Sequence, residues 1–331
     1  MIEVKDLQKT YVARGQTDTV VQALRGVSFQ IPNGGALSFI GESGCGKTTV
    51  GRILTGLEAP TRGTILWNGQ DVYQMRAKDR REVFRKVQLI HQDPYQALNP
   101  ARTIEQALVD PLKVMAKQKG RDGLWIQSRV EELLILVGLD PTTVMYKYPH
   151  MLSGGQRQRV VIARALTVEP EVLVADEAVS MIDVSLRLGI LKLLRDLREN
   201  LSISLLFITH DVAAARYVGT NGEIYVIYRG LVAEKATTDD IILRPQHPYT
   251  QALLSAVPVL KGIEAPGEDR FIPLKQLDQN EQTDAGCLFA SRCPFAKDIC
   301  KTERPLLKGQ EHDYACHFPV ERHVVATQVE A

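Results

Sequence analysis

The residues with the clearest chemical meaning stand at positions 41–48, where the chain reads Gly-Glu-Ser-Gly-Cys-Gly-Lys-Thr. The spacing G-x-x-x-x-G-K-[ST] is typical of a loop whose backbone N–H groups surround a polyphosphate. Within it, Lys47 supplies a positive charge for the outer phosphates, and the Thr48 hydroxyl is placed to coordinate Mg²⁺. The apolar run at 36–40 predicts a buried parallel strand directly before the loop. The sequence therefore predicts a nucleotide site between a strand and a helix.

Two carboxylates, Asp176 and Glu177, directly follow another short apolar run at 172–175. A strand in this position would place them at the carboxyl edge of the sheet, where open α/β folds bind ligands. Asp176 can join the Mg²⁺ shell, and Glu177 can polarise an attacking water as a general base. The alternative is an acidic pair that only starts a helix, and the phosphate-binding loop upstream weakens that interpretation.

A third polar segment reads Leu-Ser-Gly-Gly-Gln-Arg-Gln-Arg at 152–159 and precedes a run with helical apolar spacing. A turn of Ser153, Gly154 and Gly155 that opens a helix presents free N–H groups and the positive end of the helix dipole. Both features suit a γ-phosphate. The segment predicts a second phosphate site.

The elements around these segments indicate an α/β fold. Alternating apolar and polar residues before position 40 predict antiparallel strands, and further strands are expected at 64–67 and 86–90. From 103 to 166 the apolar spacing is mostly helical, which predicts a helical insertion. The runs 172–175 and 205–208 are short enough for central parallel strands, with a helix between them at 184–198. One face of the helical insertion should carry Val130, Leu133, Leu134 and Val137.

The 331 residues have an ordinary globular composition, with 44% hydrophobic and 24% charged residues. The formal charge of +1 provides no global field to attract a nucleic acid or an anionic membrane, so we expect no nucleic-acid partner. The sequence has no apolar run of eighteen residues, and its first six residues lack the pattern of a secretory signal. We therefore expect a cytosolic chain that reaches a membrane only through a partner.

Residues 152–156 resemble the signature sequence of the ATPase subunits of ATP-binding cassette (ABC) transporters, and the other elements of that family follow in the expected order. The resemblance implies that Tyr11 stacks on adenine from a loop after the first strand. It implies that Gln92 reaches Mg²⁺ and the attacking water, that Asp183 lies in the loop between paired subunits, and that His210 contacts the γ-phosphate. Taken alone, Tyr11 is also compatible with a packed surface aromatic and Gln92 with a solvated loop residue.

The same resemblance groups the expected site residues by role. Catalysis is expected from Glu177, His210 and Gln92, and the ligands of Mg²⁺ are expected to be Thr48, Gln92 and Asp176. The ATP-binding set comprises Tyr11, Gly41, Glu42, Ser43, Gly44, Cys45, Gly46, Lys47, Thr48 and Thr49. The set that caps the ATP of a paired subunit comprises Ser153, Gly154, Gly155 and Gln156. Two subunits of this family close head to tail on ATP, because the γ-phosphate supplies contacts that ADP cannot.

Three further segments resemble the ATPases of oligopeptide, dipeptide and nickel importers: residues 92–100, residues 247–254 and a terminal block of four cysteines. This resemblance implies a heterodimer with a second ATPase, beneath two membrane permeases and an extracellular solute-binding protein. The chain would then lie at the cytoplasmic face of the membrane and energise solute import. Residues 48–52 resemble the second ATPase of such pairs. Some relatives import oligosaccharides, so peptide, oligosaccharide and nickel all stay open as solutes.

The four terminal cysteines, Cys287, Cys293, Cys300 and Cys316, are expected to bind a metal, because a reducing cytosol disfavours structural disulfides. Relatives with this block hold a [4Fe–4S] cluster, zinc is the alternative, and four buried or idle cysteines without a metal also stay open. Cys45 is separate, and a packing role is expected for it inside the phosphate-binding loop. We expect an ATPase domain at 1–257, with a helical subdomain at about 95–165. An irregular cysteine-rich extension follows at 258–331, with a linker-like stretch at 258–282.

Two other classes of protein share these motifs. A soluble ABC ATPase of translation or DNA repair usually carries two cassettes or a long coiled-coil insertion, and the sequence contains neither. A non-enzymatic regulatory subunit would bind ATP without hydrolysis, which the intact Glu177 and His210 disfavour. The chain departs from the family at Ala178, Met181 and Ile182, beside the expected subunit crossing, so these residues bear on coupling between sites.

Overall fold

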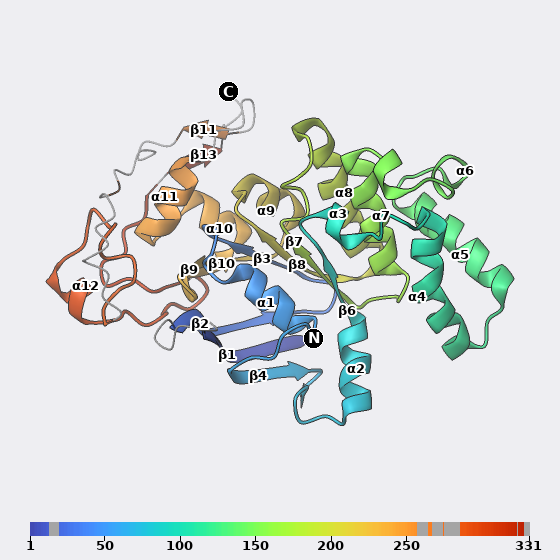
Figure 1. Cartoon of the computed structure of the whole chain (residues 1–331). Coiled ribbons are helices and arrows are strands. Elements are labelled where there is room, and N and C mark those ends of the chain that lie inside the picture. The colour runs from blue at the N-terminus through green and yellow to red at the C-terminus, as the bar shows by residue number, and fades with distance from the viewer. Residues whose placement is uncertain (13–19, 257–263, 267–273, 275–284, 323, 328–331) are drawn as a thin grey trace.

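The nucleotide-binding motifs are arranged around a seven-stranded sheet (Figure 1). The computed structural model describes residues 1–12, 20–256, 264–266, 274, 285–322 and 324–327. In spatial order the sheet contains β12 (Asp313–Tyr314), β10 (Leu231–Thr237), β9 (Glu223–Tyr228), β3 (Ala36–Ile40), β8 (Ser204–Thr209), β7 (Val172–Asp176) and β6 (Val87–Ile90). The strands from β9 to β6 are parallel. Every residue of β3, β7 and β8 is buried, which is why these strands read as continuous apolar runs.

A second sheet is antiparallel, as the alternating pattern predicts. Its order is β2 (Val20–Ile31), β1 (Ile2–Val12), β4 (Arg62–Trp67) and β5 (Gln70–Asp71). One face is apolar: Val4, Leu7 and Leu24 are buried in the same core as Leu37 and Phe39 of β3. This core fixes the second sheet against the strand that leads into the phosphate-binding loop.

Helices flank the main sheet. They include α1 (Lys47–Leu54), α2 (Ala77–Lys86), α8 (Val184–Leu201), α9 (Val212–Val218), α10 (Thr238–Leu243) and α11 (Pro248–Ala256). Helix α1 begins at Lys47 as predicted. The strand expected at 86–90 is one residue shorter, because Lys86 ends α2 and pairs with Glu171 instead.

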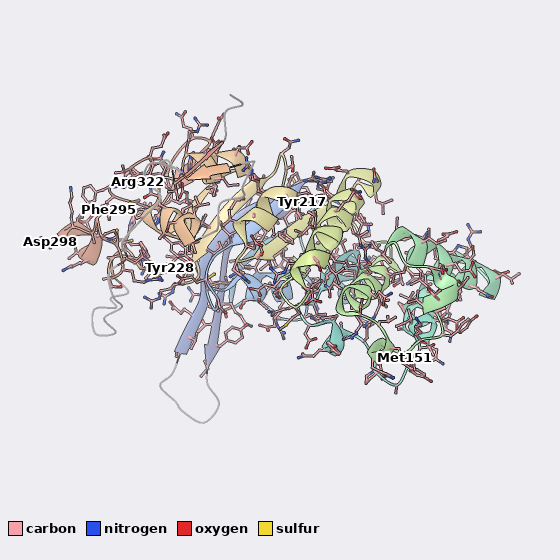
Figure 2. All side chains as sticks on the ribbon, turned by 90° about the horizontal axis from the view of Figure 1, so that it is seen from above. Met151, Tyr217, Tyr228, Phe295, Asp298 and Arg322 are labelled. Atoms are coloured by element: carbon pink, nitrogen blue, oxygen red, sulfur yellow. The ribbon has the colours of Figure 1, made fainter. Side chains whose placement is uncertain are left out.

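The helical part between β6 and β7 contains α3 (Pro94–Ala97), α4 (Ile104–Lys119), α5 (Gly123–Leu136), α6 (Pro141–Val144), a 3₁₀ turn (Pro149–Met151) and α7 (Gly154–Leu166). Thr103 starts α4 with a capping box, in which its side chain accepts from the N–H of Gln106. The predicted face of Val130, Leu133, Leu134 and Val137 is buried. Met151 of this part and Asp298 of the C-terminal extension lie at opposite ends of the molecule (Figure 2).

The C-terminal extension contains β11 (Glu264–Pro266) paired with β13 (Val325–Thr327), α12 (Asp298–Thr302) and β12 of the main sheet. Most of the linker-like stretch at 258–282, including the expected domain boundary, lies outside the described residues. Among the helices that the structure describes, none has the length and apolar character required to cross a bilayer.

Candidate functional site

The phosphate-binding loop, residues 41–48, joins β3 to α1 and folds around Lys47. The Lys47 Nζ is buried and donates to the carbonyl oxygens of Gly41 at 2.7 Å and Glu42 at 2.9 Å. Gly46, the N-cap of α1, has a φ of 107°, and a Cβ there would lie 2.4 Å from the carbonyl oxygen of Ala23. Only glycine fits this position. The loop therefore holds an ammonium group inside a ring of backbone where phosphates would bind.

Thr48 and Asp176 meet across the site. The Thr48 hydroxyl donates to Asp176 Oδ1 at 3.2 Å, which joins the first turn of α1 to the end of β7. Burial and the neighbouring Glu177 raise the pKa of Asp176, whereas the Thr48 hydroxyl and the Lys47 ammonium lower it. A hydroxyl and a carboxylate are hard oxygen donors, and Mg²⁺ prefers such ligands. This donor set fits the Mg²⁺ predicted at these two residues.

Two of the predicted catalytic residues, Gln92 and His210, contact the carboxylate of the third, Glu177. Gln92 Nε2 donates to Glu177 Oε2 at 3.0 Å, and His210 Nδ1 lies 3.3 Å from Glu177 Oε1. The three residues follow β6, β7 and β8, whose carboxyl ends meet at the same edge of the sheet. Distant parts of the sequence thus place an amide, a carboxylate and an imidazole together.

The backbone of Glu177 is in the left-handed region, with a φ of 45°. Its N–H donates to the carbonyl of Ile208 at 2.8 Å, and its own carbonyl accepts from the Ser180 N–H at 3.0 Å and the Ser180 hydroxyl at 2.9 Å. For a residue other than glycine this conformation costs about 1–3 kcal/mol. Residues in such conformations cluster at functional sites. Three hydrogen bonds hold the residue there.

The segment at 153–156 opens α7, as predicted. Ser153 is the exposed N-cap, and its hydroxyl accepts from the Gln156 N–H at 3.2 Å, while Gln156 Oε1 accepts from the Ser153 N–H at 3.0 Å. Gly155 is buried, and a Cβ there would lie 3.2 Å from Leu186 of α8. The capping box uses the Gln156 N–H and the Ser153 N–H, and the other N–H groups of a first helical turn are available as donors for an anion.

Tyr11 lies within β1, so the expectation of a loop after the first strand is wrong. The pairing of β1 with β2 continues to Val12, and it keeps Tyr11 extended. Its hydroxyl donates to Glu58 at 2.5 Å, and Lys9 Nζ lies 5.1 Å from the ring centroid. Burial and Glu58 raise the pKa of Tyr11, opposed by a hydrogen bond with Thr49. That bond connects Tyr11 to the helix that follows the phosphate-binding loop.

The segment expected to cross between subunits follows Glu177. Asp183 is the N-cap of α8, and Arg187 Nε donates to the carbonyl of Ile182 at 3.0 Å. Of the departures from the family, Ala178 and Ile182 are buried, whereas Met181 is 63% exposed. Two of the three changes therefore alter packing, and the third alters the surface.

Two residues at the phosphate-binding loop were missed by the sequence analysis. Arg292 forms an ion pair with Glu42, and the Tyr249 hydroxyl accepts from the Glu42 N–H. Both residues lie in segments whose likeness to importer ATPases is noted above, namely 247–254 and the cysteine block. That likeness was the available signal, but the pattern does not indicate which loop these residues would touch.

The four terminal cysteines line one pocket together with His317 and three phenylalanines, Phe289, Phe295 and Phe318. Burial raises the pKa of Cys287, and burial together with the other three thiols raises the pKa of Cys316 to about 12. No three His, Cys, Asp or Glu side chains among the described residues come together as a metal-binding group. Metal binding would have to release protons from these thiols.

Cys45 is buried inside the phosphate-binding loop. Burial raises the pKa of its thiol, and Lys47 lowers it. Its sulfur lies 3.5 Å from the Lys47 Nζ, so the side chain packs beneath the ammonium group.

Comparison with known families connects these features. The model of the ABC transporter family matches residues 24–180, and the model of the oligopeptide/dipeptide transporter C-terminal region matches residues 233–300. The oligopeptide transport ATP-binding protein AppF of Bacillus subtilis (strain 168) is 38% identical, and the alignment covers 96% of this chain and 97% of AppF. This chain belongs to the ABC transporter family. The dipeptide transport ATP-binding protein DppF of Escherichia coli (strain K12) is also 38% identical, over 97% of this chain and 95% of DppF.

Solved structures confirm the fold class of this ABC cassette. The dimeric, post-hydrolysis state of the ATP-binding cassette MJ0796, bound to ADP and Pi, matches with a TM-score of 0.63 at 28% identity. The match covers 72% of this chain and 99% of MJ0796. CbiO1 of Clostridium perfringens, part of the ABC transporter complex CbiONQ, matches with a TM-score of 0.61 at 26% identity, over 72% of this chain and 89% of CbiO1.

Proposed function

We propose that this chain is the ATP-hydrolysing subunit of an ABC importer of oligopeptides or dipeptides. The observation that carries the proposal is the convergence of Gln92 and His210 on Glu177, beside the Thr48–Asp176 pair. The peptide substrate class is supported by the names of the relatives AppF and DppF and by the C-terminal region that matches at 233–300.

The proposal assigns a role to each residue of the site. Lys47 and the backbone N–H groups of the phosphate-binding loop bind the β- and γ-phosphates of ATP, and Tyr11 contacts the adenine. Thr48, Asp176 and Gln92 hold Mg²⁺, which when bound neutralises phosphate charge. Glu177 accepts a proton from the attacking water, while His210 orients that water toward the γ-phosphate.

The segment at 153–156 serves the ATP of a second subunit in this proposal. An exposed helix N-terminus can approach a γ-phosphate held by another chain, so ATP joins two cassettes head to tail and hydrolysis separates them. Asp183 lies at the crossing between the two. The partner is a second ATPase, and both contact two permeases that receive solute from an extracellular binding protein. The chain therefore works at the cytoplasmic face of the membrane.

Replacement of Glu177 by glutamine tests the catalytic assignment. Glutamine keeps the size of the side chain but accepts no proton, so turnover should fall by about 100-fold or more while MgATP binding changes little. Glu131→Gln, at an exposed residue of α5, is the matched control. ATPase activity and nucleotide affinity are measured on the purified transporter. Near-normal turnover of the Glu177→Gln transporter would remove Glu177 from its role.

The solute class has a separate test. The transporter, reconstituted in vesicles with its binding protein, should accumulate labelled dipeptide or oligopeptide when ATP is present on the side of this chain. Accumulation of an oligosaccharide or of Ni²⁺ in place of peptide would contradict the assignment.

We further propose that the chain contains an ATPase domain at 1–257, with a helical subdomain at about 95–165, and an extension at 258–331. In this proposal the extension holds a [4Fe–4S] cluster on Cys287, Cys293, Cys300 and Cys316. A shared pocket with aromatic walls supports this proposal, because four thiols of one pocket match the ligand set of such a cluster. Protein purified without oxygen should contain about four irons per chain and absorb near ~400 nm. Colourless protein with stoichiometric zinc, or with no metal, would contradict it.

A further inference from the structure

The C-terminal extension contacts the phosphate-binding loop through an ion pair. Arg292 NH1 donates to Glu42 Oε2 at 2.8 Å, and Arg292 NH2 donates to Glu42 Oε1 at 2.9 Å. The geometry is bidentate, which is the stronger and more directional form of an arginine–carboxylate pair. The Arg292 side chain is 15% exposed and the Glu42 side chain is 43% exposed, so solvent screens this ion pair in part.

Glu42 is fixed at three points. Its side chain is held by Arg292, its carbonyl oxygen accepts from Lys47 Nζ at 2.9 Å, and its N–H donates to the Tyr249 hydroxyl at 2.9 Å. Tyr249 is buried, so its hydroxyl has a defined position. Two of these three contacts, those with Tyr249 and Arg292, come from residues more than 200 positions away.

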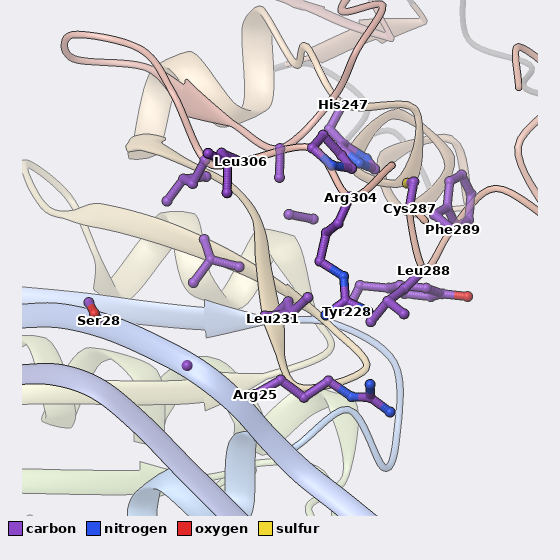
Figure 3. Close-up of a pocket in the computed structure, with 16 residues that line it drawn as sticks. Arg25, Ser28, Tyr228, Leu231, His247, Cys287, Leu288, Phe289, Arg304 and Leu306 are labelled. Atoms are coloured by element: carbon purple, nitrogen blue, oxygen red, sulfur yellow. The ribbon is translucent and has the colours of Figure 1, made fainter. Parts of the chain in front are cut away.

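Arg292 is itself positioned by aromatic packing. The rings of Tyr228, Tyr249 and Phe289 form a cluster with centroid distances of 4.5 to 5.4 Å. The Arg292 guanidinium lies 5.7 Å from the Phe289 ring. Figure 3 shows Tyr228, Phe289 and Cys287 around the adjoining pocket. The packing connects the cysteine segment to the loop without an intervening flexible element.

The charges of Glu42 and Arg292 determine how this ion pair affects phosphate binding. A carboxylate beside a polyphosphate site repels the ligand, and the effect is large where the site is partly shielded from water. The guanidinium neutralises that carboxylate through two hydrogen bonds. We propose that Arg292, assisted by Tyr249, is a positioning residue for nucleotide binding, so that the C-terminal extension completes the phosphate site of the cassette. The inference rests on the proposed ATP-binding role of the loop.

Variants of the pair separate charge from packing. In the purified full-length chain, Arg292→Met should weaken MgATP binding by about tenfold or more, because it leaves Glu42 unneutralised. Arg292→Lys should lose less affinity for MgATP, because lysine keeps the positive charge although it cannot form the bidentate pair. The double variant Glu42→Gln with Arg292→Met should recover most of the lost affinity, because no carboxylate remains to repel phosphate.

Lys235→Met is the matched control. Lys235 Nζ pairs with Asp313 Oδ2 at 2.9 Å and also joins the extension to the cassette, but at β10 and β12, away from the phosphate-binding loop. The Lys235→Met substitution should leave nucleotide affinity unchanged. In the assembled transporter, the Arg292→Met defect should fall on KM more than on kcat, since Arg292 does not touch the reacting atoms.

Several outcomes would overturn the inference. MgATP binding by Arg292→Met that equals wild type would do so, and so would a double variant no better than Arg292→Met. If Arg292→Met fails to fold, as judged by thermal unfolding, Glu42→Gln alone decides: binding at least as tight as wild type supports the charge argument, and weaker binding contradicts it. Failure of the wild-type chain to bind MgATP would instead overturn the proposed function.

Discussion

At the scale of single residues, the phosphate-binding loop depends on glycines for two different reasons. Gly44 has a φ of 79°, but a Cβ there would meet no atom within 4 Å. Gly46 combines a φ of 107° with a backbone oxygen 2.4 Å from the site of a Cβ and a Leu24 methyl group at 2.9 Å. The first position requires only a left-handed backbone, whereas the second also requires the absence of a side chain.

This difference predicts unequal costs for two alanine substitutions. Gly44→Ala should lower the free energy of unfolding by about 1 kcal/mol, the usual cost of a left-handed backbone. Gly46→Ala should lower it by roughly 3 kcal/mol or more, because overpacking against main chain adds to that cost. Urea unfolding without nucleotide measures both. Equal decreases in the free energy of unfolding of the two variants would contradict the steric explanation for Gly46.

At the scale of elements, the start of helix α11 explains how Tyr249 reaches the loop. Glu234 of β10 is fully buried and accepts from the N–H groups of Gln246 at 2.7 Å and His247 at 3.0 Å, and from His312 Nε2 at 2.6 Å. His247 Nδ1 in turn accepts from the Tyr249 N–H at 3.0 Å. These bonds fix the first turn of α11 and therefore the direction of the tyrosine ring.

The buried imidazole predicts a pH dependence of stability. Burial lowers the pKa of His247 to about 4, only partly opposed by the charge of Glu234. Because the unfolded chain, with a histidine pKa near ~6.5, binds the proton more readily, stability is full above that value and falls as pH decreases toward 4. The loss in this window is at most roughly 3 kcal/mol.

The comparison is made with His247→Asn, whose amide oxygen can still accept from the Tyr249 N–H. The free energy of unfolding of wild type should decrease more steeply than that of the variant between pH 6.5 and 4. His150→Gln changes an exposed histidine and should follow wild type. Parallel curves for wild type and His247→Asn would show that His247 does not titrate in this way.

Local patterns predicted most of these elements, and the reasons are physical. Strands β3, β7 and β8 are mostly apolar because they are buried on both faces, and α7 begins directly after Ser153 because a capping box is encoded within four residues. The motifs also placed Lys47, Thr48 and Asp176 correctly at strand and helix ends. Their expected roles in catalysis stay predictions.

What escaped prediction depends on long-range packing. The extended backbone of Tyr11 results from its pairing with β2, and the Arg292–Glu42 pair joins residues 250 positions apart. No periodicity or spacing encodes such a contact, because it exists only once the extension has packed on the cassette. The left-handed backbone of Glu177 is likewise imposed by Ile208 and Ser180 rather than by its own residue type.

At the scale of the whole molecule, the two segments expected to bind phosphate lie in different parts of the fold. The phosphate-binding loop lies between β3 and α1 of the main sheet, and the turn at 153–156 opens α7 of the helical part. Within the part of the chain that the structure describes, no hydrogen bond or ion pair joins these two segments. In its proposed role the turn needs a second cassette, whose ATP it caps.

This requirement predicts a separation of binding from turnover. Ser153→Arg places a bulky cation on an exposed N-cap, so the chain should still bind MgATP at its own loop while ATP turnover of the transporter falls by about tenfold or more. Ser128→Arg, on the exposed surface of α5, is the control. Equilibrium nucleotide binding and steady-state hydrolysis are measured on the same preparations. Normal turnover with arginine at position 153 would contradict a head-to-tail ATP sandwich.

The short strand β12 has a consequence for the solubility of shortened chains. Residues 313 and 314 pair with Lys235 and Glu234, and the N–H of Ala315 donates to the carbonyl of Ala233 at 2.8 Å. If the polypeptide stopped before residue 313, the outer edge of β10 would lose these hydrogen-bond partners and could pair with strands of other copies. A cassette cut free of its tail would therefore tend to aggregate, for a reason unrelated to nucleotide or metal.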